Sequence, residues 1–145
     1  MVDQVTASVV GCGWMGEYYV QWLCGHHNVE LISIVDSDPD KLRLMSKKYG
    51  VERSYLDVRK MLDSQVPDVV MIVTPTAYFK KLVLVCAEAG VNGILVEKPI
   101  GGLLSDVDEM IHACESNGIV FGRGRRPVAY TPLRAHETYL HLVCR

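Results

Sequence analysis

A glycine pattern near the start of the chain is the first feature that could carry chemistry. Gly11, Gly13 and Gly16 form a G-x-G-x-x-G sequence that follows an apolar run and opens a helix-like segment. The first glycine permits a tight turn, the second lets the backbone approach a pyrophosphate, and the third lets a helix and a strand pack closely. We therefore predict a dinucleotide-binding loop, for which the alternative is a tight turn that holds no ligand. The loop comprises Gly11, Cys12, Gly13, Trp14, Met15 and Gly16.

An acidic residue stands 20 positions after the third glycine, at the end of the next apolar run. The carboxylate of this residue, Asp36, could accept both ribose hydroxyls of an adenosine, and its charge repels a 2′-phosphate. The sequence therefore favours NAD over NADP. Ser37, Lys41 and Arg43 follow closely, and a basic side chain there could accommodate the phosphate, so NADP stays an alternative. Asp36 could also be a simple turn or cap residue.

A second group of candidate residues ends two later apolar runs. Thr74 and Pro75 follow the strongest of these runs, and Glu97-Lys98-Pro99 follows the next one. Ligands of open α/β sheets bind at the carboxyl ends of the strands, so we expect both groups near the glycine loop. Charged residues are rarely buried unless they are paired or used, and this favours a site over an ordinary surface turn.

Alternating strand-like and helix-like segments must position these residues. We expect six strands at residues 5–10, 29–35, 51–55, 68–74, 93–97 and 119–121. We expect helices at residues 14–24, 39–49, 57–64, 77–89 and 105–117, with Asp38 capping the second, and Ser105 and Asp108 forming a capping box on the last. This alternation predicts the α/β class, with a doubly wound parallel sheet of the Rossmann type.

Composition sets further bounds. The chain has 145 residues, 49% of them hydrophobic and 22% charged, which is typical of a globular domain. The net charge of −2 predicts no binding to nucleic acid or to an anionic membrane, and no apolar run approaches the ~20 residues of a membrane span. With no signal-like start, we expect a cytoplasmic location. Five widely spaced cysteines without a C-x-x-C pair predict buried, reduced thiols and no metal site.

The last part of the chain differs in composition. Residues 123–145 contain five arginines and one acid, Glu137. We predict a dinucleotide-binding domain at residues 1–122, followed by a basic tail or the truncated start of a second domain at residues 123–145. Glu137 and His141 are weak candidates for proton transfer.

The sequence resembles the glucose–fructose oxidoreductase / inositol dehydrogenase (Gfo/Idh/MocA) family over residues 5 to 122. The segments that carry the resemblance are VVGCGWMG, IVDSDPDK, VTPTAYF and AGVNGILVEKPI, in that order. Members of this family combine an N-terminal Rossmann domain with a C-terminal α/β domain. They transfer hydride between NAD(P) and a sugar, cyclitol or related hydroxyl or carbonyl compound.

The resemblance implies a role for each matching residue. The glycines hold the pyrophosphate, and Asp36 binds the adenine ribose. Thr74 and Pro75 lie on the nicotinamide side. Glu97 contacts the nicotinamide ribose, while Lys98 faces the substrate as the catalytic residue, and the bond before Pro99 is often cis in the family. One departure is Phe79, which stands where family members often have histidine.

Three functional interpretations follow. The first is the cofactor domain of such an oxidoreductase, with little activity alone because most substrate contacts come from a second domain. The second is a non-catalytic dinucleotide-binding module or subunit. The third is another two-domain dehydrogenase, against which Glu97-Lys98-Pro99 argues; a methyltransferase fits the third glycine less well. Apolar surface left at the carboxyl edge of the sheet leads us to expect self-association as a homo-oligomer.

Overall fold

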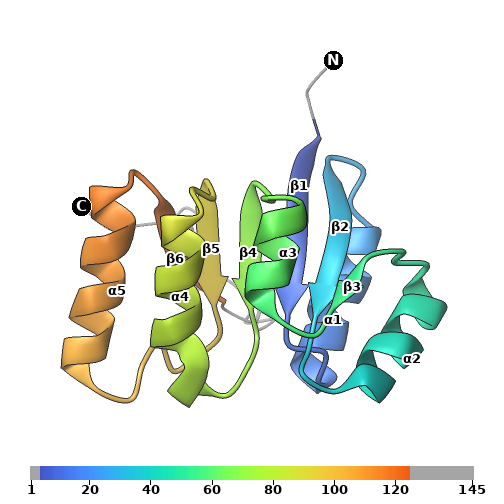
Figure 1. Ribbon diagram of the computed structural model, residues 1–145, viewed down its shortest axis with the longest axis horizontal. Helices are drawn as coiled ribbons and strands as arrows, with labels where there is room; N and C mark the ends of the chain where they lie inside the picture. The colour runs from blue at the N-terminus through green and yellow to red at the C-terminus, as the bar shows by residue number, and fades with distance from the viewer. Residues whose placement is uncertain (1–3, 125–145) are drawn as a thin grey trace, which may run out of the picture.

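The computed structural model describes residues 4–124 and contains one six-stranded sheet between two layers of helices (Figure 1). The strands are β1 (Val5–Val10), β2 (Val29–Val35), β3 (Ser54–Tyr55), β4 (Val69–Ile72), β5 (Gly93–Val96) and β6 (Val120–Arg123). The helices are α1 (Trp14–Cys24), α2 (Pro39–Tyr49), α3 (Val58–Ser64), the 3-10 segment η1 (Thr76–Tyr78), α4 (Phe79–Glu88) and α5 (Leu104–Ser116). The strands lie in the order β3-β2-β1-β4-β5-β6 and pair in parallel. The predicted doubly wound Rossmann sheet is confirmed.

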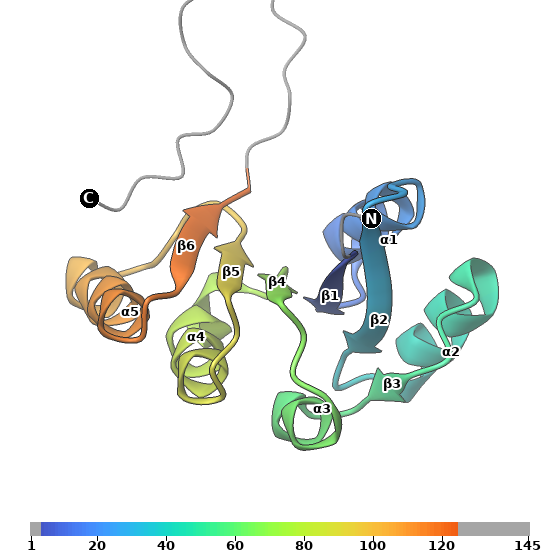
Figure 2. The same ribbon diagram turned by 90° about the horizontal axis from the view of Figure 1, so that it is seen from above.

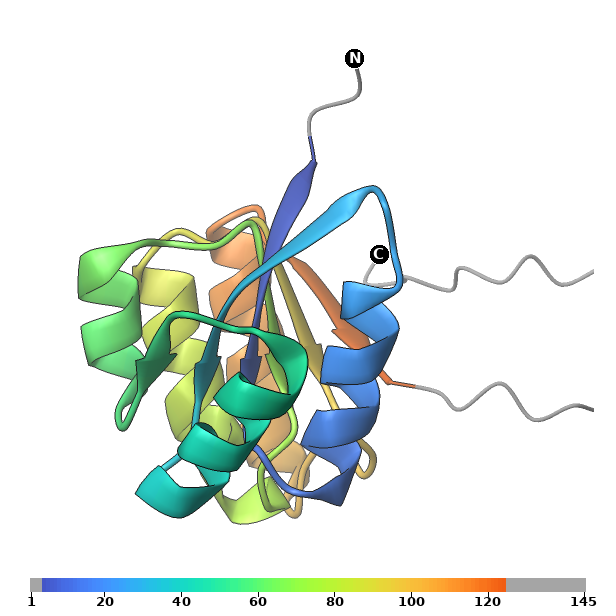
Figure 3. The same cartoon turned by 90° about the vertical axis from the view of Figure 1, so that its right-hand side faces the viewer.

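Helices cover both faces of the sheet. Figure 2 shows α3, α4 and α5 along one face and α1 on the other, and Figure 3 shows the sheet between these layers. One hydrophobic cluster joins the sheet to α1 and α2 and includes the fully buried Val9 and Val20. The other joins it to α3, α4 and α5 and includes Ile72, Val83 and Met110. A parallel sheet needs this cover because its central strands are apolar on both sides.

The order of the strands places the predicted site. The chain passes from β1 to β2 and β3 on one side of the sheet, and then crosses to β4 on the other side of β1. Such a reversal opens a crevice at the carboxyl ends of the two central strands. The glycine loop leaves β1 at this edge, which lies at the bottom of Figure 1. Asp36, Thr74 and Glu97 follow β2, β4 and β5 at the same edge.

Local signals define the elements of the first half of the chain, and β1, α1, β2 and α2 have the bounds predicted for them. The carboxylate of Asp38 caps α2 by accepting hydrogen bonds from the backbone N–H groups of Asp40 at 2.9 Å and Lys41 at 3.3 Å. Pro39 fits the first turn, where no N–H donor is needed. Gly50 ends the helix with a φ of 68°, a conformation that glycine adopts without strain.

The third predicted strand is shorter than residues 51–55 and contains only Ser54–Tyr55. The reason is that the N–H of Val51 bonds the carbonyl of Ser46 at 3.2 Å and so closes α2. The fourth and fifth strands end before Thr74 and Glu97, and the last strand extends to Arg123, one residue past the predicted domain boundary.

Two predicted helices begin differently. The helix predicted at residues 77–89 starts as η1, because the N–H of Tyr78 bonds Pro75, and continues as α4 from Phe79. The predicted cap at Ser105 is wrong. Helix α5 begins one residue earlier, with the backbone carbonyl of Leu103 accepting from the N–H of Val107 at 3.2 Å and no side chain capping it. Ser105 and Asp108 therefore lie inside the helix.

The cysteines follow the prediction in part. Cys12, Cys86 and Cys114 are buried, whereas Cys24 is exposed at the end of α1.

Within residues 4–124, no helix is long and apolar enough to cross a membrane. Cys144 and the other predictions for residues 125–145, including those for Glu137 and His141, lie outside the described residues.

Asp68 ties three segments together at the opposite end of the sheet. One carboxylate oxygen accepts hydrogen bonds from the N–H and the hydroxyl of Thr6, at 2.9 Å and 2.7 Å, and the other accepts from the Asn92 side chain at 2.9 Å. These bonds, first of all those from Thr6, hold the pKa of Asp68 below its usual value. The network joins the start of β1 to the segments that precede β4 and β5.

We predict that Asp68→Ala destabilises the fold by about 2 kcal/mol, because three donors lose a charged acceptor. Chemical denaturation followed by circular dichroism measures this change. Asp63→Ala, at an exposed position of α3, is the matched control and should change stability by less than about 0.5 kcal/mol.

The same network makes stability depend on pH. Because folding lowers the pKa of Asp68, its contribution is complete above the unfolded-state pKa of about 3.9 and is lost as pH falls through the lower folded-state pKa. The difference in stability between wild type and Asp68→Ala should therefore shrink in acid. A difference that stays constant down to pH 2 would contradict this account.

Candidate dinucleotide-binding site

Two of the three loop glycines are required by the fold itself. Gly11 has a φ of 108°, and a Cβ there would lie 2.7 Å from the carbonyl oxygen of Val73. A Cβ on Gly16 would collide with the carbonyl oxygen of Gly11. These glycines let the first turn of α1 pack directly on the end of β1.

Gly13 differs from its two neighbours in the motif. Its φ of −78° and ψ of −170° suit any residue, and no atom lies within 4 Å of the position that a Cβ would take. The residue is exposed at the N-terminus of α1, where no side chain caps the helix. Neither the backbone conformation nor the packing of the chain requires glycine here, and a Cβ would project into open space beside the loop.

The other loop residues divide between core and surface. Cys12 is buried, and its thiol donates to the carbonyl of Val35 at 3.7 Å. Burial, with the nearby Asp36 charge, raises the pKa of Cys12 to about 12, so the thiol stays protonated and packs as a small apolar group. Met15 packs beside the cluster under α1, whereas the Trp14 side chain is 69% exposed.

Asp36 lies beside the glycine loop, as predicted, and its carboxylate is held by two backbone donors. Oδ2 accepts from the N–H of Cys12 at 2.7 Å, and Oδ1 accepts from the N–H of Asp38 at 2.9 Å. Each carboxylate oxygen keeps a second lone pair for a ribose hydroxyl. Ser37 follows on the surface.

The basic residues that could favour NADP have different surroundings. The Arg43 guanidinium pairs with the Asp40 carboxylate at 2.9 Å, and both side chains are exposed. Lys41 lies in the first turn of α2, where its backbone N–H donates to the Asp38 carboxylate at 3.3 Å, and the residue is exposed.

The second group of predicted residues lies at the ends of β4 and β5. Thr74 is half-buried, and its hydroxyl donates to the carbonyl of Pro75 at 3.4 Å. The N–H of Glu97 bonds the carbonyl of Ile72 at 3.2 Å, so the two strand ends are joined. Lys98 is exposed, and the Lys98–Pro99 bond is cis, as the resemblance implied.

Tyr19 is a residue that the sequence did not single out. It lies on the buried side of α1, and its hydroxyl donates to Oε1 of Glu97 at 2.5 Å. The only signal in the sequence was a tyrosine on an apolar helix face, where a buried hydroxyl needs a partner. Phe79, the first residue of α4, is fully buried in the hydrophobic core.

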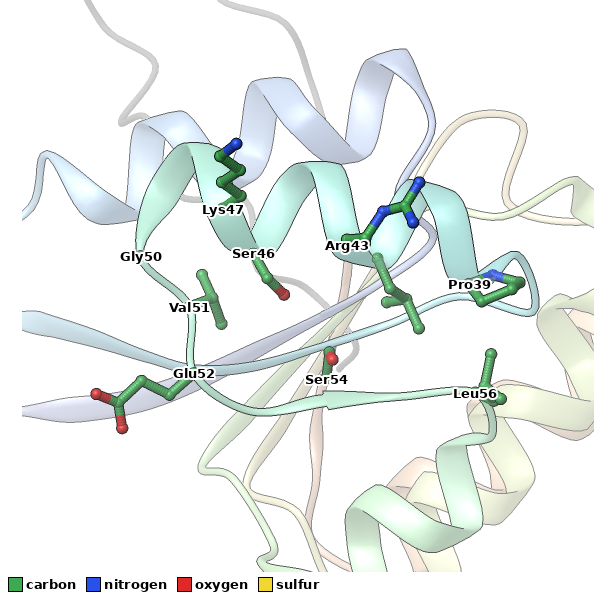
Figure 4. A pocket seen from close by; sticks show the side chains of 10 residues that line it. Pro39, Arg43, Ser46, Lys47, Gly50, Val51, Glu52, Ser54 and Leu56 are labelled. Carbon is green, nitrogen blue, oxygen red and sulfur yellow. The ribbon is translucent and has the colours of Figure 1, made fainter.

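A well-defined hollow lies elsewhere. It has a volume of about 760 Å³ and is lined by ten residues of α2, β3 and their flanks, among them Arg43, Ser46, Lys47 and Leu56 (Figure 4). Of the residues considered for coenzyme binding, only Arg43 lines it. It is an open surface groove at the β3 edge of the sheet. In the part of the chain that the structure describes, no three His, Cys, Asp or Glu residues are grouped to hold a metal.

Comparison with known proteins agrees with this geometry. Residues 5–124 match the model of the Gfo/Idh/MocA oxidoreductase family, described as an NAD-binding Rossmann fold. The chain belongs to the Gfo/Idh/MocA family. The matched region contains the glycine loop, Asp36 and Glu97-Lys98-Pro99, so the structure is that of the family's NAD-binding Rossmann domain.

Relatives within the Gfo/Idh/MocA family are longer. The chain is 29% identical to D-apiose dehydrogenase of Paraburkholderia graminis over 138 residues, which is 95% of this chain and 33% of that protein. It is 31% identical to myo-inositol 2-dehydrogenase of Thermotoga maritima, covering 80% of this chain and 34% of that one. The chain thus spans about a third of the length of these relatives.

Solved structures show the same relation. An oxidoreductase from Agrobacterium radiobacter, in complex with NAD+, L-tartaric acid and magnesium, superposes with a TM-score of 0.79 at 26% identity. The match covers 83% of this chain and 35% of that one. Myo-inositol 2-dehydrogenase from Lactobacillus plantarum gives a TM-score of 0.78 at 28% identity, over 84% of this chain and 36% of that one.

We predict that Gly13→Ala leaves the fold intact but weakens NADH binding at least about tenfold, because the added methyl group occupies the open space in which a pyrophosphate would approach the loop backbone. Thermal unfolding and calorimetric titration with NADH measure the two effects. Gly16→Ala is the matched comparison: its methyl group collides with the Gly11 carbonyl, so it should destabilise the fold by about 2 kcal/mol or more. Wild-type affinity for NADH in Gly13→Ala would contradict the assignment of the loop.

Proposed function

We propose that the protein acts as an NAD(P)-dependent oxidoreductase, and that this chain supplies its cofactor-binding domain. The reaction is hydride transfer to or from a sugar, a cyclitol or a related hydroxyl or carbonyl compound. The observation that carries this proposal is Gly13, because neither backbone strain nor packing requires glycine there. An approaching pyrophosphate supplies the reason.

The arrangement of the strands supports a path for the dinucleotide. Asp36 follows β2 and accepts the hydroxyls of the adenine ribose, and the loop before α1 takes the pyrophosphate at the positive end of the helix dipole. The order β2-β1-β4-β5 then directs the second nucleoside over the ends of β4 and β5. Thr74, Pro75 and Glu97 lie there.

Lys98 is the residue we assign to catalysis. Its ammonium is exposed at the carboxyl edge of the sheet, next to Glu97. It polarises the oxygen of the substrate hydroxyl or carbonyl and assists the movement of the proton on that oxygen. A nicotinamide coenzyme held at this edge would supply the hydride acceptor or donor.

Coenzyme selectivity tests the role of Asp36. We expect the chain to bind NADH about tenfold more tightly than NADPH, since the carboxylate accepts ribose hydroxyls and repels a 2′-phosphate. Asp36→Asn should weaken NADH binding and narrow this difference, as measured by calorimetric titration with each coenzyme. Asp108→Asn, at an exposed position of α5, is the control. Failure of the folded wild type to bind either coenzyme would refute the proposed function.

Catalysis also needs groups that fix the substrate and exclude water, and the relatives are about three times longer than this chain. We therefore expect the 145-residue chain alone to turn over sugars and cyclitols at least about a hundredfold more slowly than a full-length relative assayed in parallel. An assay of NADH formation over a substrate panel measures this. Turnover comparable to that of the relative would contradict the expectation.

Large apolar side chains are exposed at the carboxyl edge. Trp14 lies at the start of α1, Tyr78 in η1, and Leu103 and Leu104 at the start of α5, each more than half exposed. This arrangement supports self-association through the edge, which stays a prediction, as do a cytoplasmic location and the absence of nucleic-acid binding.

A further inference from the structure

The hydrogen bond between Tyr19 and Glu97 joins two segments that are 78 residues apart. Tyr19 lies one helical turn after the glycine loop, and Glu97 directly follows β5. The Tyr19 side chain is buried, and burial, together with the Glu97 carboxylate, holds its pKa well above the usual tyrosine value. The Tyr19 hydroxyl therefore stays protonated at neutral pH and remains a hydrogen-bond donor.

The Glu97 carboxylate is fixed on both sides. Oε1 accepts from the Tyr19 hydroxyl at 2.5 Å, and Oε2 accepts from the backbone N–H of Lys98 at 3.1 Å. Gly124 passes directly over the pair, because a Cβ there would collide with the Tyr19 hydroxyl, and its N–H bonds the carbonyl of Val96 at 2.7 Å. The ends of β5 and β6 and the first half of α1 thus meet at one carboxylate.

The two oxygens of this carboxylate retain acceptor capacity. A carboxylate offers about four lone-pair positions, and the Tyr19 hydroxyl and Lys98 N–H occupy one on each oxygen. One position on each oxygen is left for further donors. Two adjacent ribose hydroxyls match this pattern, in the way that they match Asp36 at the other end of the site.

The strand order brings such a ribose to Glu97. The glycine loop follows β1, and β5 lies two strands away, or about 10 Å at the usual strand spacing. That distance is within the reach of the second nucleoside of a dinucleotide whose pyrophosphate rests on the loop. ADP lacks this second nucleoside and would not extend so far.

We propose that Tyr19 is a positioning residue for the coenzyme: its hydroxyl holds the Glu97 carboxylate where it accepts the hydroxyls of the nicotinamide-side ribose. This proposal rests on the proposed function, since it requires a dinucleotide on the glycine loop. Tyr19 acts through Glu97 and touches no reacting atom.

The test compares NADH with ADP on the 145-residue chain. Tyr19→Phe removes only the hydroxyl, and we expect it to weaken NADH binding about tenfold while ADP binding changes less than about twofold. Calorimetric titration gives both dissociation constants. Tyr18→Phe makes the same chemical change on the neighbouring, partly exposed ring and should leave both affinities at the wild-type values.

Glu97→Gln supplies a second measurement that does not depend on how well Tyr19→Phe folds. It keeps an acceptor for the Tyr19 hydroxyl but removes the charge, so it should also weaken NADH and spare ADP. Glu97→Ala removes the acceptor altogether, so if Tyr19 acts only through Glu97, the double variant Tyr19→Phe/Glu97→Ala should lose no more NADH affinity than Glu97→Ala alone.

Several outcomes would overturn the proposal. These are wild-type NADH affinity in Tyr19→Phe or in Glu97→Gln, an equal loss of ADP and NADH affinity, or additive losses in the double variant. Equal loss would assign Tyr19 a purely structural role. A wild-type chain that binds neither ADP nor NADH would instead refute the proposed function, so the two failures are distinguishable.

Discussion

The close contact between Gly16 and the carbonyl of Gly11 is the constraint on which the rest of the site depends. It exists only because Gly16 carries no side chain at the point where the first turn of α1 meets the end of β1, and Gly11 in turn carries none where it approaches the Val73 carbonyl. The contact fixes the helix on the sheet with its N-terminus at the crevice. Tyr19, one turn further along α1, is thereby brought close enough to reach the carboxylate at the end of β5.

Sequence reasoning succeeded where the determining chemistry is local. The bounds of α2 could be predicted because Asp38, Pro39 and Gly50 each act within a few residues of the helix end. The glycine loop and Asp36 were also predictable, since their spacing reflects a single strand-helix-strand unit. The family resemblance implies roles for Glu97 and Lys98 that no local pattern assigns, and these roles stay predictions.

Sequence reasoning failed where tertiary contacts decide. The bond from Tyr19 to Glu97 spans 78 residues, and no spacing rule reports it. Ser105 has the side chain of a helix cap, but α5 begins with the carbonyl of Leu103 because the loop from Pro99 enters the helix one residue earlier. Arg43 could have faced a phosphate, yet it pairs with Asp40 one turn away on its own helix. Each outcome depends on competition between partners that only the folded chain brings together.

The two backbone bonds of Asp36 have a consequence for the evolution and redesign of coenzyme preference. The carboxylate that would select the ribose also ties the glycine loop, through the Cys12 N–H, to the turn that begins α2, through the Asp38 N–H. Exchange of this side chain for one without an acceptor oxygen therefore removes a mechanical link as well as the charge that distinguishes the two coenzymes. Such an exchange leaves the N–H groups of Cys12 and Asp38 without this acceptor, so a change in coenzyme preference also changes the support of the loop.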